Sequence, residues 1–472
     1  MPAACEEPKT HGSSGQRFCI FQRTCSPLLS KRESAEGENV RIRGLFYLLV
    51  VLVFWSVPIR AAERLIVRVN GGMRAIQAAC LVAGCTVAES IDGGLGEVYL
   101  VAPPAFSNLD AVLQALSNAI GVVDVEPGLE GSVADSSRDF PAALRDETPM
   151  SYYGATVPEG YVQQPATENI RLPDATEAFP HAAGAGVVAV IDTGVDPSHP
   201  ALAGVLIPGY DFTRNKGGAD EKLDVNMGGT SPATSSEPVW TSSNTAADVS
   251  QSTAAVVDGN SQYGDFGHGT MVAGIIHLVA PSAKILPLKA FHSDGTGYTS
   301  DILRAIYYAT AHHANVLNMS FTLPAYSREI ATALDLATES GMILVAAAGN
   351  NGQDVLVYPA ALWDVMGIAS ASNDDQISQF SNYGPNLVWV AAPGEGVVTT
   401  YPFSTYAAGW GTSFSAPFVS GTAALMLSIN QFCDQYGSSQ STAHAHPMNP
   451  NAGHGQLDIY QAMQAWWQAT GR

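Results

Sequence analysis

Six nearly continuous apolar segments between residues 186 and 393, separated by stretches of helical periodicity, constrain the fold of this chain more than any other feature. A strand that is buried on both faces lacks the apolar–polar alternation of a strand with one face in water. Segments of this kind that alternate with helices indicate an α/β architecture, a mostly parallel sheet with helices on both faces. The expected strands are 186–192, 283–290, 315–321, 342–350, 365–371 and 387–393, and the expected helices are 268–279, 299–314, 325–340, 413–429 and 457–468.

Three polar motifs lie at the ends of these expected elements, where sites gather in parallel sheets. "VVAVIDTGVD" puts Asp192 at the end of the first strand, and "DFGHGTMVAGIIHLVA" puts His268 at the start of an apolar helix. "GWGTSFSAPF" puts Ser413 at or just before the start of a helix whose first turn would contain Pro417. Each residue also has a purely structural explanation, as a turn aspartate, a helix-start histidine or an N-cap serine.

Together, the three residues supply the groups that nucleophilic acyl transfer requires. A serine hydroxyl is a weak nucleophile unless a base takes its proton, and the base needs an acid that holds its tautomer. Asp192, His268 and Ser413 follow one another in one of the chain orders known for such triads. Asn350, in "VAAAGNNG", follows another expected strand and could donate its amide to a developing oxyanion, although it also suits a turn.

With these motifs, the chain resembles the subtilisin-like serine proteases. The resemblance is carried by "VIDTGVD", "HGTMVAG", "LNMSF", "AAAGN" and "GTSFSAP", which span Val190 to Pro417 in family order, and by "GHGQLDIYQAM" at 453–463. It implies a subtilisin-like fold and a serine endopeptidase that hydrolyses peptide bonds through an acyl-enzyme, without a cofactor or a catalytic metal. We therefore expect polypeptides as substrates and a monomeric enzyme.

The resemblance also assigns roles to individual residues. Asp192, His268 and Ser413 would form the catalytic triad, and Asn350 with the backbone N–H of Ser413 would form the oxyanion hole. An extended substrate would pair with two segments that flank the cleft, because main-chain pairing supplies affinity and pockets under alternate side chains supply selectivity. The substrate-binding residues implied in this way are Gly295, Thr296, Gly297, Ser320, Phe321, Thr322 and Gly349.

The family pattern is not matched at the wall of the primary pocket. Where the family usually has a serine followed by glycines, this chain has "SFTL" at 320–323, so Thr322 and Leu323 are expected to narrow the pocket. The expected walls, 320–323 and 347–349, carry no charge. Since an unpaired buried charge is costly, the pocket should accept apolar side chains.

Residues 63–130 have the pattern of a separate small unit. Strand-like and helix-like segments follow one another in the order βαββαβ, the split pattern of ferredoxin-like folds. By resemblance, this unit is similar to the family's propeptide, which assists folding, inhibits the enzyme and is removed on maturation. Cys80 and Cys85 flank the end of its first helix and are interpreted as core packing.

The remaining boundaries follow changes in composition. Residues 131–169 are polar and lack a sustained period, so we expect a linker that contains the maturation site. The catalytic domain would then occupy 170–472, with a mobile surface insertion at the Ser-, Thr- and Gly-rich stretch 213–262. Residues 1–43 form an N-terminal extension of different composition. If translation starts near Val40, nearly all of this extension is not part of the protein.

The apolar run at 44–59 bears on localisation. It follows "RIR" and is shorter than the ~20 residues of a spanning helix, so 44–62 is interpreted as a signal peptide. The enzyme would then be secreted or periplasmic; the alternative is an enzyme anchored to the membrane by an uncleaved segment. The formal net charge of −21 argues against nucleic acid as a partner.

Two alternative functions remain open from the sequence. A pseudoprotease would keep the fold and bind peptides without cutting them, and labelling of Ser413 by a fluorophosphonate would separate it from an enzyme. The related Ser-Glu-Asp carboxyl peptidases share the serine motif, but this chain has His268 in "HGT" where a glutamate would be needed.

The sequence predicts no calcium at the main site of the family. That site needs a loop inserted after the catalytic histidine and an aspartate shortly after the first motif, whereas this chain runs without a loop from His268 to Lys284 and has Ala201 at the aspartate position. Calcium needs six to eight oxygen ligands. A tight site, occupied at a thousand times its Kd, would contribute ~4 kcal/mol. We therefore expect a chelator to leave the melting temperature unchanged, and a large drop would contradict the prediction.

Overall fold

The computed structural model of the protein describes residues 64–104, 107–128, 130–132, 141–225, 239–240, 248–249 and 263–470. The predicted extension at 1–43 and the predicted signal peptide at 44–62 lie outside these residues, as does most of the insertion predicted at 213–262.

An eight-stranded sheet forms the centre of the molecule, in the order β10-β9-β13-β8-β15-β16-β17-β18. All neighbouring strands are parallel except β9 and β10. The predicted mostly parallel sheet is therefore confirmed. The strands are β8 (Val187–Asp192), β9 (Tyr210–Asp211), β10 (Lys216–Gly217), β13 (Lys284–Lys289), β15 (Val316–Met319), β16 (Ile343–Ala347), β17 (Met366–Ala371) and β18 (Val390–Pro393).

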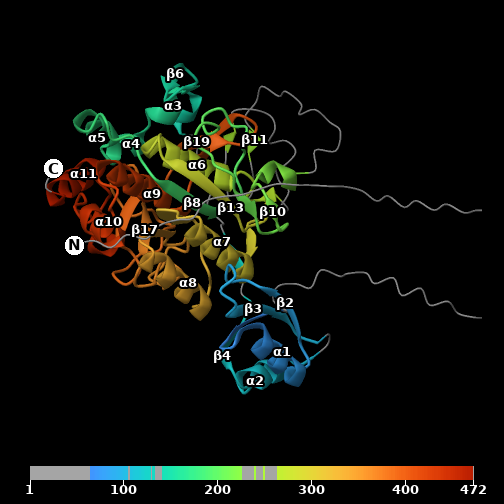
Figure 1. Ribbon diagram of the computed structural model, residues 1–472. Helices are drawn as coiled ribbons and strands as arrows, with labels where there is room; N and C mark the ends of the chain where they lie inside the picture. The colour runs from blue at the N-terminus through green and yellow to red at the C-terminus, as the bar shows by residue number, and fades with distance from the viewer. Residues whose placement is uncertain are drawn as a thin grey trace, which may run out of the picture. The chain divides into compact units, whose positions relative to one another are not determined.

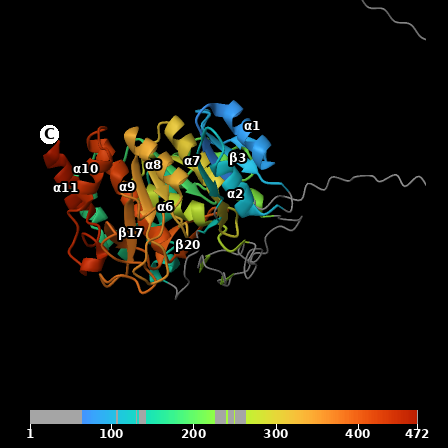
Figure 2. The same cartoon turned by 90° about the horizontal axis from the view of Figure 1, so that it is seen from below.

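Helices cover both faces of this sheet (Figures 1 and 2), so its strands are apolar on both sides. Within β8, Val188 and Val190 belong to one hydrophobic core, and Ala189 and Ile191 belong to the other. The first core is closed by α6 and α9, and the second by α7 and α8. These helices are α6 (His268–Val279), α7 (Thr299–Ala311), α8 (Arg328–Glu339) and α9 (Thr412–Ile429).

The strand order changes direction at β8, because β13 lies on one side of it and β15 on the other. In open α/β sheets, such a switch point opens a crevice at the carboxyl ends of the strands. Asp192 is the last residue of β8. The topology therefore puts this aspartate where a site is expected.

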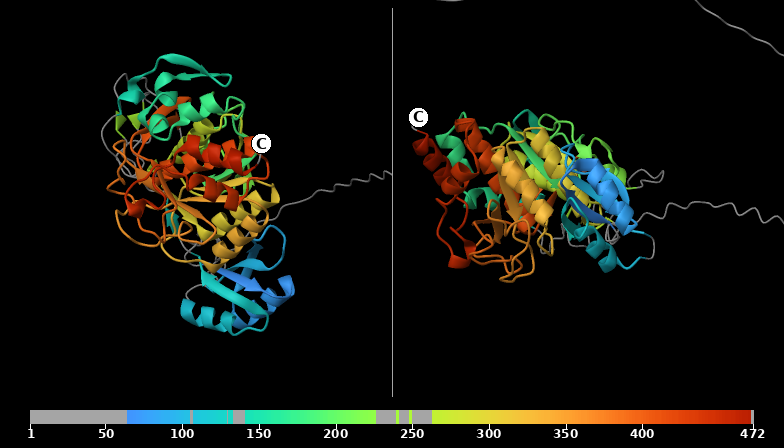
Figure 3. Two further views of the ribbon diagram at one scale, coloured as in Figure 1. Left: turned by 90° about the vertical axis from the view of Figure 1, so that its left-hand side faces the viewer. Right: turned by 60° about the horizontal axis from the view of Figure 1, so that its bottom comes forward.

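The C-terminal part of the chain completes the first core. A hairpin of β19 (Val397–Tyr401) and β20 (Thr405–Gly409) leads into α9, and β20 also pairs with β12 (Asp248–Val249), which pairs with β11 (Val239–Trp240). Helices α10 (Gln435–Thr442) and α11 (Ile459–Ala469) pack with α9, as the red helices of Figure 3 show. Within the described part of the chain, α9 alone is long and apolar enough to cross a membrane, but 94% of it is buried inside the fold. Its apolar character therefore matches a core helix.

The N-terminal unit has the predicted element order βαββαβ. Its antiparallel sheet has the strand order β2-β3-β1-β4, and α1 and α2 cover one face (Figure 1). On the other face, Ile66 and Leu100 belong to the same hydrophobic core as residues of α7 and α8. The elements are β1 (Leu65–Val69), α1 (Gly72–Ala83), β2 (Thr86–Ser90), β3 (Val98–Ala102), α2 (Leu109–Ser117) and β4 (Val122–Pro127).

The linker predicted at 131–169 is wrong for 141–169, which fold as part of the main domain. The Tyr161 hydroxyl donates to the carbonyl of Gly274 at 2.7 Å, and the Gln164 side chain bonds both N and O of Val398 at 2.8 Å. The segment consists of short elements held by such long-range contacts, so it has no sustained period. They are η2 (Ala142–Arg145), β6 (Pro149–Tyr152), β7 (Ala155–Pro158), α3 (Glu159–Val162) and α4 (Pro165–Asn169), followed by α5 (Leu172–Ala178).

The surface insertion predicted at 213–262 begins too early. Residues 213–225 contain β10 and the 3-10 helix η3 (Glu221–Asp224), and they join the central fold. The side chain of Glu221 is only 1% exposed. A polar composition alone did not distinguish these buried polar residues from a solvated loop.

We predict that Gly421→Ala destabilises the protein, because α6 and α9 touch closely at this position. A Cβ at Gly421 would lie 2.6 Å from the Cβ of Val279. Such overpacking costs about 1–3 kcal/mol, which outweighs the gain of up to ~1 kcal/mol from replacing a helical glycine. Calorimetry should show a lower melting temperature. Gly217→Ala is the control, since nothing lies within 4 Å of its added Cβ, and an equal effect of both changes would contradict the prediction.

Candidate active site

Asp192 and His268 form a hydrogen-bonded pair at the switch point of the sheet. His268 is the first residue of α6 and follows Gly267, whose φ of 92° turns the chain into the helix. The Nδ1 atom of His268 lies 2.7 Å from Oδ1 of Asp192, and both side chains are fully buried. The same carboxylate oxygen accepts the backbone N–H of Thr193 at 2.7 Å. The aspartate therefore holds one edge of the imidazole, and Nε2 lies on the opposite edge.

Ser413 is the second residue of α9, in the turn whose backbone N–H groups have no partner within the helix. Phe414, the next residue, has its ring 5.6 Å from the His268 ring. The Ser413 hydroxyl donates to the carbonyl of Ser320 at 3.2 Å. Residues from the ends of β8 and β15 and the starts of α6 and α9 thus come together.

The prediction that Pro417 lies in the first turn of this helix is wrong, because α9 begins at Thr412 and Pro417 is in the second turn. Proline has no N–H, so it cannot donate to the carbonyl four residues before it, which is that of Ser413. The Ser320 hydroxyl donates to this carbonyl instead, at 2.8 Å. The proline thus leaves the Ser413 carbonyl without its helical donor. Ser320, directly after β15, bonds this carbonyl and so holds the backbone of Ser413 in place.

This anchor continues into a buried chain of hydrogen bonds. Nδ2 of Asn318 donates to the Ser320 hydroxyl at 2.9 Å, and the Ser420 hydroxyl donates to Oδ1 of Asn318 at 2.8 Å. Asn318 and Ser420 lie in β15 and α9. Sequence reasoning missed their role, and the only available signal was single polar residues within apolar elements.

Asn350 lies next to Ser413 and is held by the residue before it. Its Oδ1 accepts both the backbone N–H and the hydroxyl of Thr412, each at 2.9 Å. The Thr412 hydroxyl also accepts the N–H of Gly349 at 3.0 Å. Since the amide oxygen is engaged in this way, the NH₂ group is the part of Asn350 that can serve as a donor beside the serine.

The segment Gly295–Gly297 overlaps β14 (Thr296–Tyr298), which pairs antiparallel with β5 (Glu130–Ser132), the strand at the C-terminal end of the N-terminal unit. Gly297 faces Gly131, and Thr296 faces Ser132. The predicted substrate-binding edge therefore already carries an extended segment of this chain.

Ser320, Phe321 and Thr322 follow the end of β15. A Cβ added to Gly349 would lie 3.3 Å from the Thr322 methyl group, so these two predicted pocket residues are neighbours. The expected effect of Leu323 on the pocket is not supported. Its side chain is fully buried in the hydrophobic core, and its backbone bonds Tyr358.

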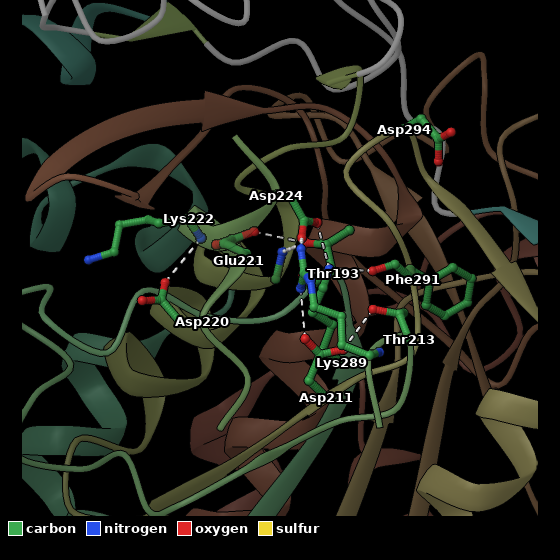
Figure 4. Close-up of polar contacts among 12 residues, drawn as sticks. Thr193, Asp211, Thr213, Asp220, Glu221, Lys222, Asp224, Lys289, Phe291 and Asp294 are labelled. Atoms are coloured by element: carbon green, nitrogen blue, oxygen red, sulfur yellow. Dashed lines mark hydrogen bonds and ion pairs between the residues drawn. The ribbon is translucent and has the colours of Figure 1, made fainter. Parts of the chain in front are cut away.

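A network of buried charges surrounds Thr193, the residue that follows Asp192 (Figure 4). Nζ of Lys289 donates to the carbonyls of Thr193 and Phe291, each at 2.6 Å, and to Oδ2 of Asp224 at 2.7 Å. Arg214 bonds the carboxylates of Asp224 and Asp211. The lysine thus connects the carboxyl ends of β8 and β13 to η3.

Glu221 belongs to the same region, although it lies within the stretch predicted to be a mobile surface insertion, 213–262. Its carboxylate accepts the Thr193 hydroxyl and the Gly267 N–H, each at 3.0 Å, and both the N–H and the hydroxyl of Thr270. Burial raises the pKa of Glu221 to about 8, while the hydrogen bond from Thr270 and the charge of Lys289 act in the opposite direction. A solvated and a buried acidic residue look alike in sequence, so only the packing identified this one.

The described residues contain no group of three or more His, Cys, Asp and Glu side chains that could hold a metal ion. Helix α6 runs from His268 to Val279 without an inserted loop, and Ala201 is 4% exposed.

Comparisons with known proteins match residues 184–448 to the subtilase family, Peptidase_S8. The chain is 33% identical over 321 residues to a thermophilic serine proteinase of Bacillus sp. (strain AK1), covering 68% of this chain and 67% of that protein. It is 32% identical over 265 residues to thermitase of Thermoactinomyces vulgaris, covering 54% of this chain and 79% of thermitase.

Among solved structures, fervidolysin from Fervidobacterium pennivorans, a keratinolytic enzyme related to subtilisin, matches with a TM-score of 0.65 and 21% identity. The match covers 85% of this chain and 61% of the fervidolysin chain. At this identity, the likeness concerns the fold.

We predict that Lys289→Met destabilises the protein by about 3–5 kcal/mol, because it removes a cation that, together with Arg214, pairs with the buried Asp224 and leaves two carbonyls unpaired. Denaturant unfolding should show the loss. Lys284→Met, at the other end of the same strand, is the matched control, since Lys284 is exposed and donates to a single carbonyl, that of Gly204. Equal stability of both variants would show that the buried lysine contributes little.

Proposed function

The chain belongs to the subtilase family of serine endopeptidases, and we propose that Asp192, His268 and Ser413 are its catalytic triad. The observation that carries the proposal is the 2.7 Å bond between Nδ1 of His268 and the Asp192 carboxylate, next to Ser413 in the first turn of α9. A triad of nucleophile, base and acid accounts for the meeting of these three element ends.

In the proposed reaction, the Ser413 hydroxyl attacks the carbonyl carbon of the scissile peptide bond. Nε2 of His268 takes the hydroxyl proton and later gives it to the leaving amine, while Asp192 stabilises the imidazolium and keeps Nδ1 protonated. Water then attacks the acyl-enzyme with the same histidine as the base. The Ser413 hydroxyl, which donates to Ser320 in the structure, must turn toward His268 for the attack.

We propose that the oxyanion is bound by the Asn350 amide and the backbone N–H of Ser413. Preorganised donors are effective because they need not reorient as charge develops. Two hydrogen bonds from Thr412 to the amide oxygen support this role, since they fix the orientation of the amide group. The anchor between Ser320 and the Ser413 carbonyl supports it further by holding the serine backbone in place.

The substrate is proposed to lie as an extended polypeptide along β14, with the residue before the cut between Ser320–Thr322 and Gly349. Antiparallel pairing of β14 with β5 supports this, because a segment of the chain itself already uses that edge. Uncharged walls favour apolar side chains. Thr322, adjacent to Gly349, disfavours the bulkiest aromatics.

We propose that residues 63–130 act as an inhibitory propeptide of a monomeric, secreted or periplasmic enzyme. The N-terminal unit contacts the main domain through charged groups as well as β5. Arg68 pairs with the buried Glu329 at 2.7 Å, and Glu126 accepts the Ser327 hydroxyl at 2.6 Å and the Arg328 N–H at 3.1 Å, at the start of α8. These contacts hold the unit while β5 occupies the substrate edge, which accounts for inhibition.

Ser413→Ala should abolish peptide-bond cleavage without unfolding the protein, because alanine fits the helix start but cannot form the acyl-enzyme. A residual rate of up to about 10³-fold over water can survive through the oxyanion donors and substrate binding. Hydrolysis of a peptide library measures turnover, and a fluorophosphonate should label the wild type but not the variant. A folded wild type without label or turnover would instead favour a peptide-binding pseudoprotease.

The precursor should cut itself between Ser132 and Pro141. Residues 141–169 are packed into the catalytic core, so a cut there would require unfolding, whereas β5 ends at Ser132 on the proposed substrate edge. N-terminal sequencing of the active enzyme should find a start within 133–141. The Ser413→Ala protein should keep the N-terminal unit. A mature start near residue 63, or within the folded segment, would contradict the proposal.

A further inference from the structure

Two buried thiols face each other in the N-terminal unit. Cys80 lies near the end of α1 and Cys85 directly before β2. Their sulfur atoms are 2.7 Å apart, and the residues are 4% and 8% exposed. The third cysteine of the described residues, Cys433, is in the main domain and has no cysteine partner there.

The backbone already brings the two residues together. The N–H of Cys85 donates to the carbonyl of Cys80 at 3.0 Å, and Gly84 ends the helix in the left-handed conformation with φ 74°. A disulfide bond is ~2.05 Å long. Closing the remaining gap needs a small rotation of the two side chains, while the helix, the turn and the strand can stay in place.

We propose that Cys80 and Cys85 form a disulfide bond in the secreted precursor, a step that rests on the proposed secretion. The thiolate of one cysteine attacks an external disulfide, that of a thiol–disulfide oxidoreductase or of oxidised glutathione, and forms a mixed disulfide. The second thiolate displaces the carrier. Two protein thiols are thus oxidised, and the carrier disulfide is reduced to two thiols. The bond ties the end of α1 to the start of β2.

Peptide mapping of the secreted Ser413→Ala precursor tests the bond, because that protein should keep the N-terminal unit. After alkylation in denaturant without reductant, trypsin releases residues 75–138, which contain both cysteines and no other. This peptide should carry no alkyl group and be lighter than the reduced peptide by two hydrogens. Cys85→Ser should add one alkyl group at Cys80, whereas Cys433→Ser, the matched control, should change nothing in this peptide.

A second arm separates the bond from the proposed secretion. The folded, reduced precursor is incubated with oxidised glutathione and mapped in the same way. If the peptide closes here but is reduced in the protein from cells, the thiols are competent and secretion is the part that fails. If it carries two alkyl groups or two glutathiones after this treatment, the proposed disulfide is overturned.

A different observation supports a second inference, at Glu221. Its carboxylate bonds Thr193, the residue after Asp192, and also the N–H groups that flank His268 in sequence, those of Gly267 and Thr270. Thr193 in turn accepts the N–H of Gly269 through its hydroxyl at 3.0 Å. One buried side chain therefore joins the end of β8 to the start of α6. The charged and titratable groups that face it are Asp192, Lys289 and Tyr401.

We infer that Glu221 is a positioning residue. It acts through Thr193 and the first turn of α6 to keep the side chains of Asp192 and His268 in position for their hydrogen bond. A carboxyl group suits this place because all four contacts can donate to its two oxygens. An amide at the same position would present an NH₂ group to a backbone N–H, so one of the ties would be lost.

Glu221→Gln should lower kcat by about 10²-fold, the scale expected for a displacement of reacting groups by ~1 Å. KM should stay unchanged, because β14 and the pocket are not touched, and fluorophosphonate labelling of Ser413 should slow in parallel. Asp458→Asn is the matched control, a buried carboxylate at the start of α11, which should keep the wild-type kcat.

If Glu221→Gln does not fold, Thr193→Val decides, since it keeps the shape of the side chain and removes the hydroxyl that bonds Glu221. It should show the same selective loss of kcat. Unchanged kcat in the folded variant, or a loss of kcat that is explained by fewer active molecules in a titration, would overturn the inference.

Discussion

A carboxylate buried at the carboxyl end of a central parallel strand is the constraint on which this structure depends. Asp192 is almost inaccessible to water, and an ion in such a place is tolerated only when hydrogen bonds replace its hydration. His268 and the N–H of Thr193 provide these bonds to Oδ1, while Oδ2 is buried without a partner among the described residues. The surrounding elements therefore have to end where they can supply these donors. The switch point of the sheet allows this, because a crevice opens there at the carboxyl ends of the strands.

The neighbouring charges serve the same requirement. Lys289 binds the backbone of Thr193 and the carboxylate of Asp224, and Glu221 binds Thr193 and the first turn of α6. Each buried charge has several hydrogen-bond partners, which is the condition under which buried ions are retained. At the start of α9, Pro417 has no N–H to donate to the carbonyl of Ser413, so this carbonyl accepts the Ser320 hydroxyl. The proposed nucleophile and the proposed base are thus anchored by separate networks.

The N-terminal unit relates to the proposed site through the same edge that would bind a substrate. β5 pairs with β14 in the antiparallel manner of an added strand, while Arg68 and Glu126 contact α8. Strand addition supplies main-chain hydrogen bonds and little side-chain selectivity. The proposed inhibition and the proposed substrate binding would therefore use the same main-chain groups of β14.

The sequence by itself determined the α/β sheet, its main helices, the βαββαβ unit and the residues of the proposed triad. Those features depend on local patterns, such as apolar runs, helical periodicity and polar motifs at element ends, which chain neighbours alone define. Only the tertiary structure decided that Glu221 and Lys289 are buried, that 141–169 belong to the core, and that Leu323 is part of the hydrophobic core. The physical reason is that the burial of a polar residue depends on partners far away in the chain, and a polar loop and a buried network have the same composition.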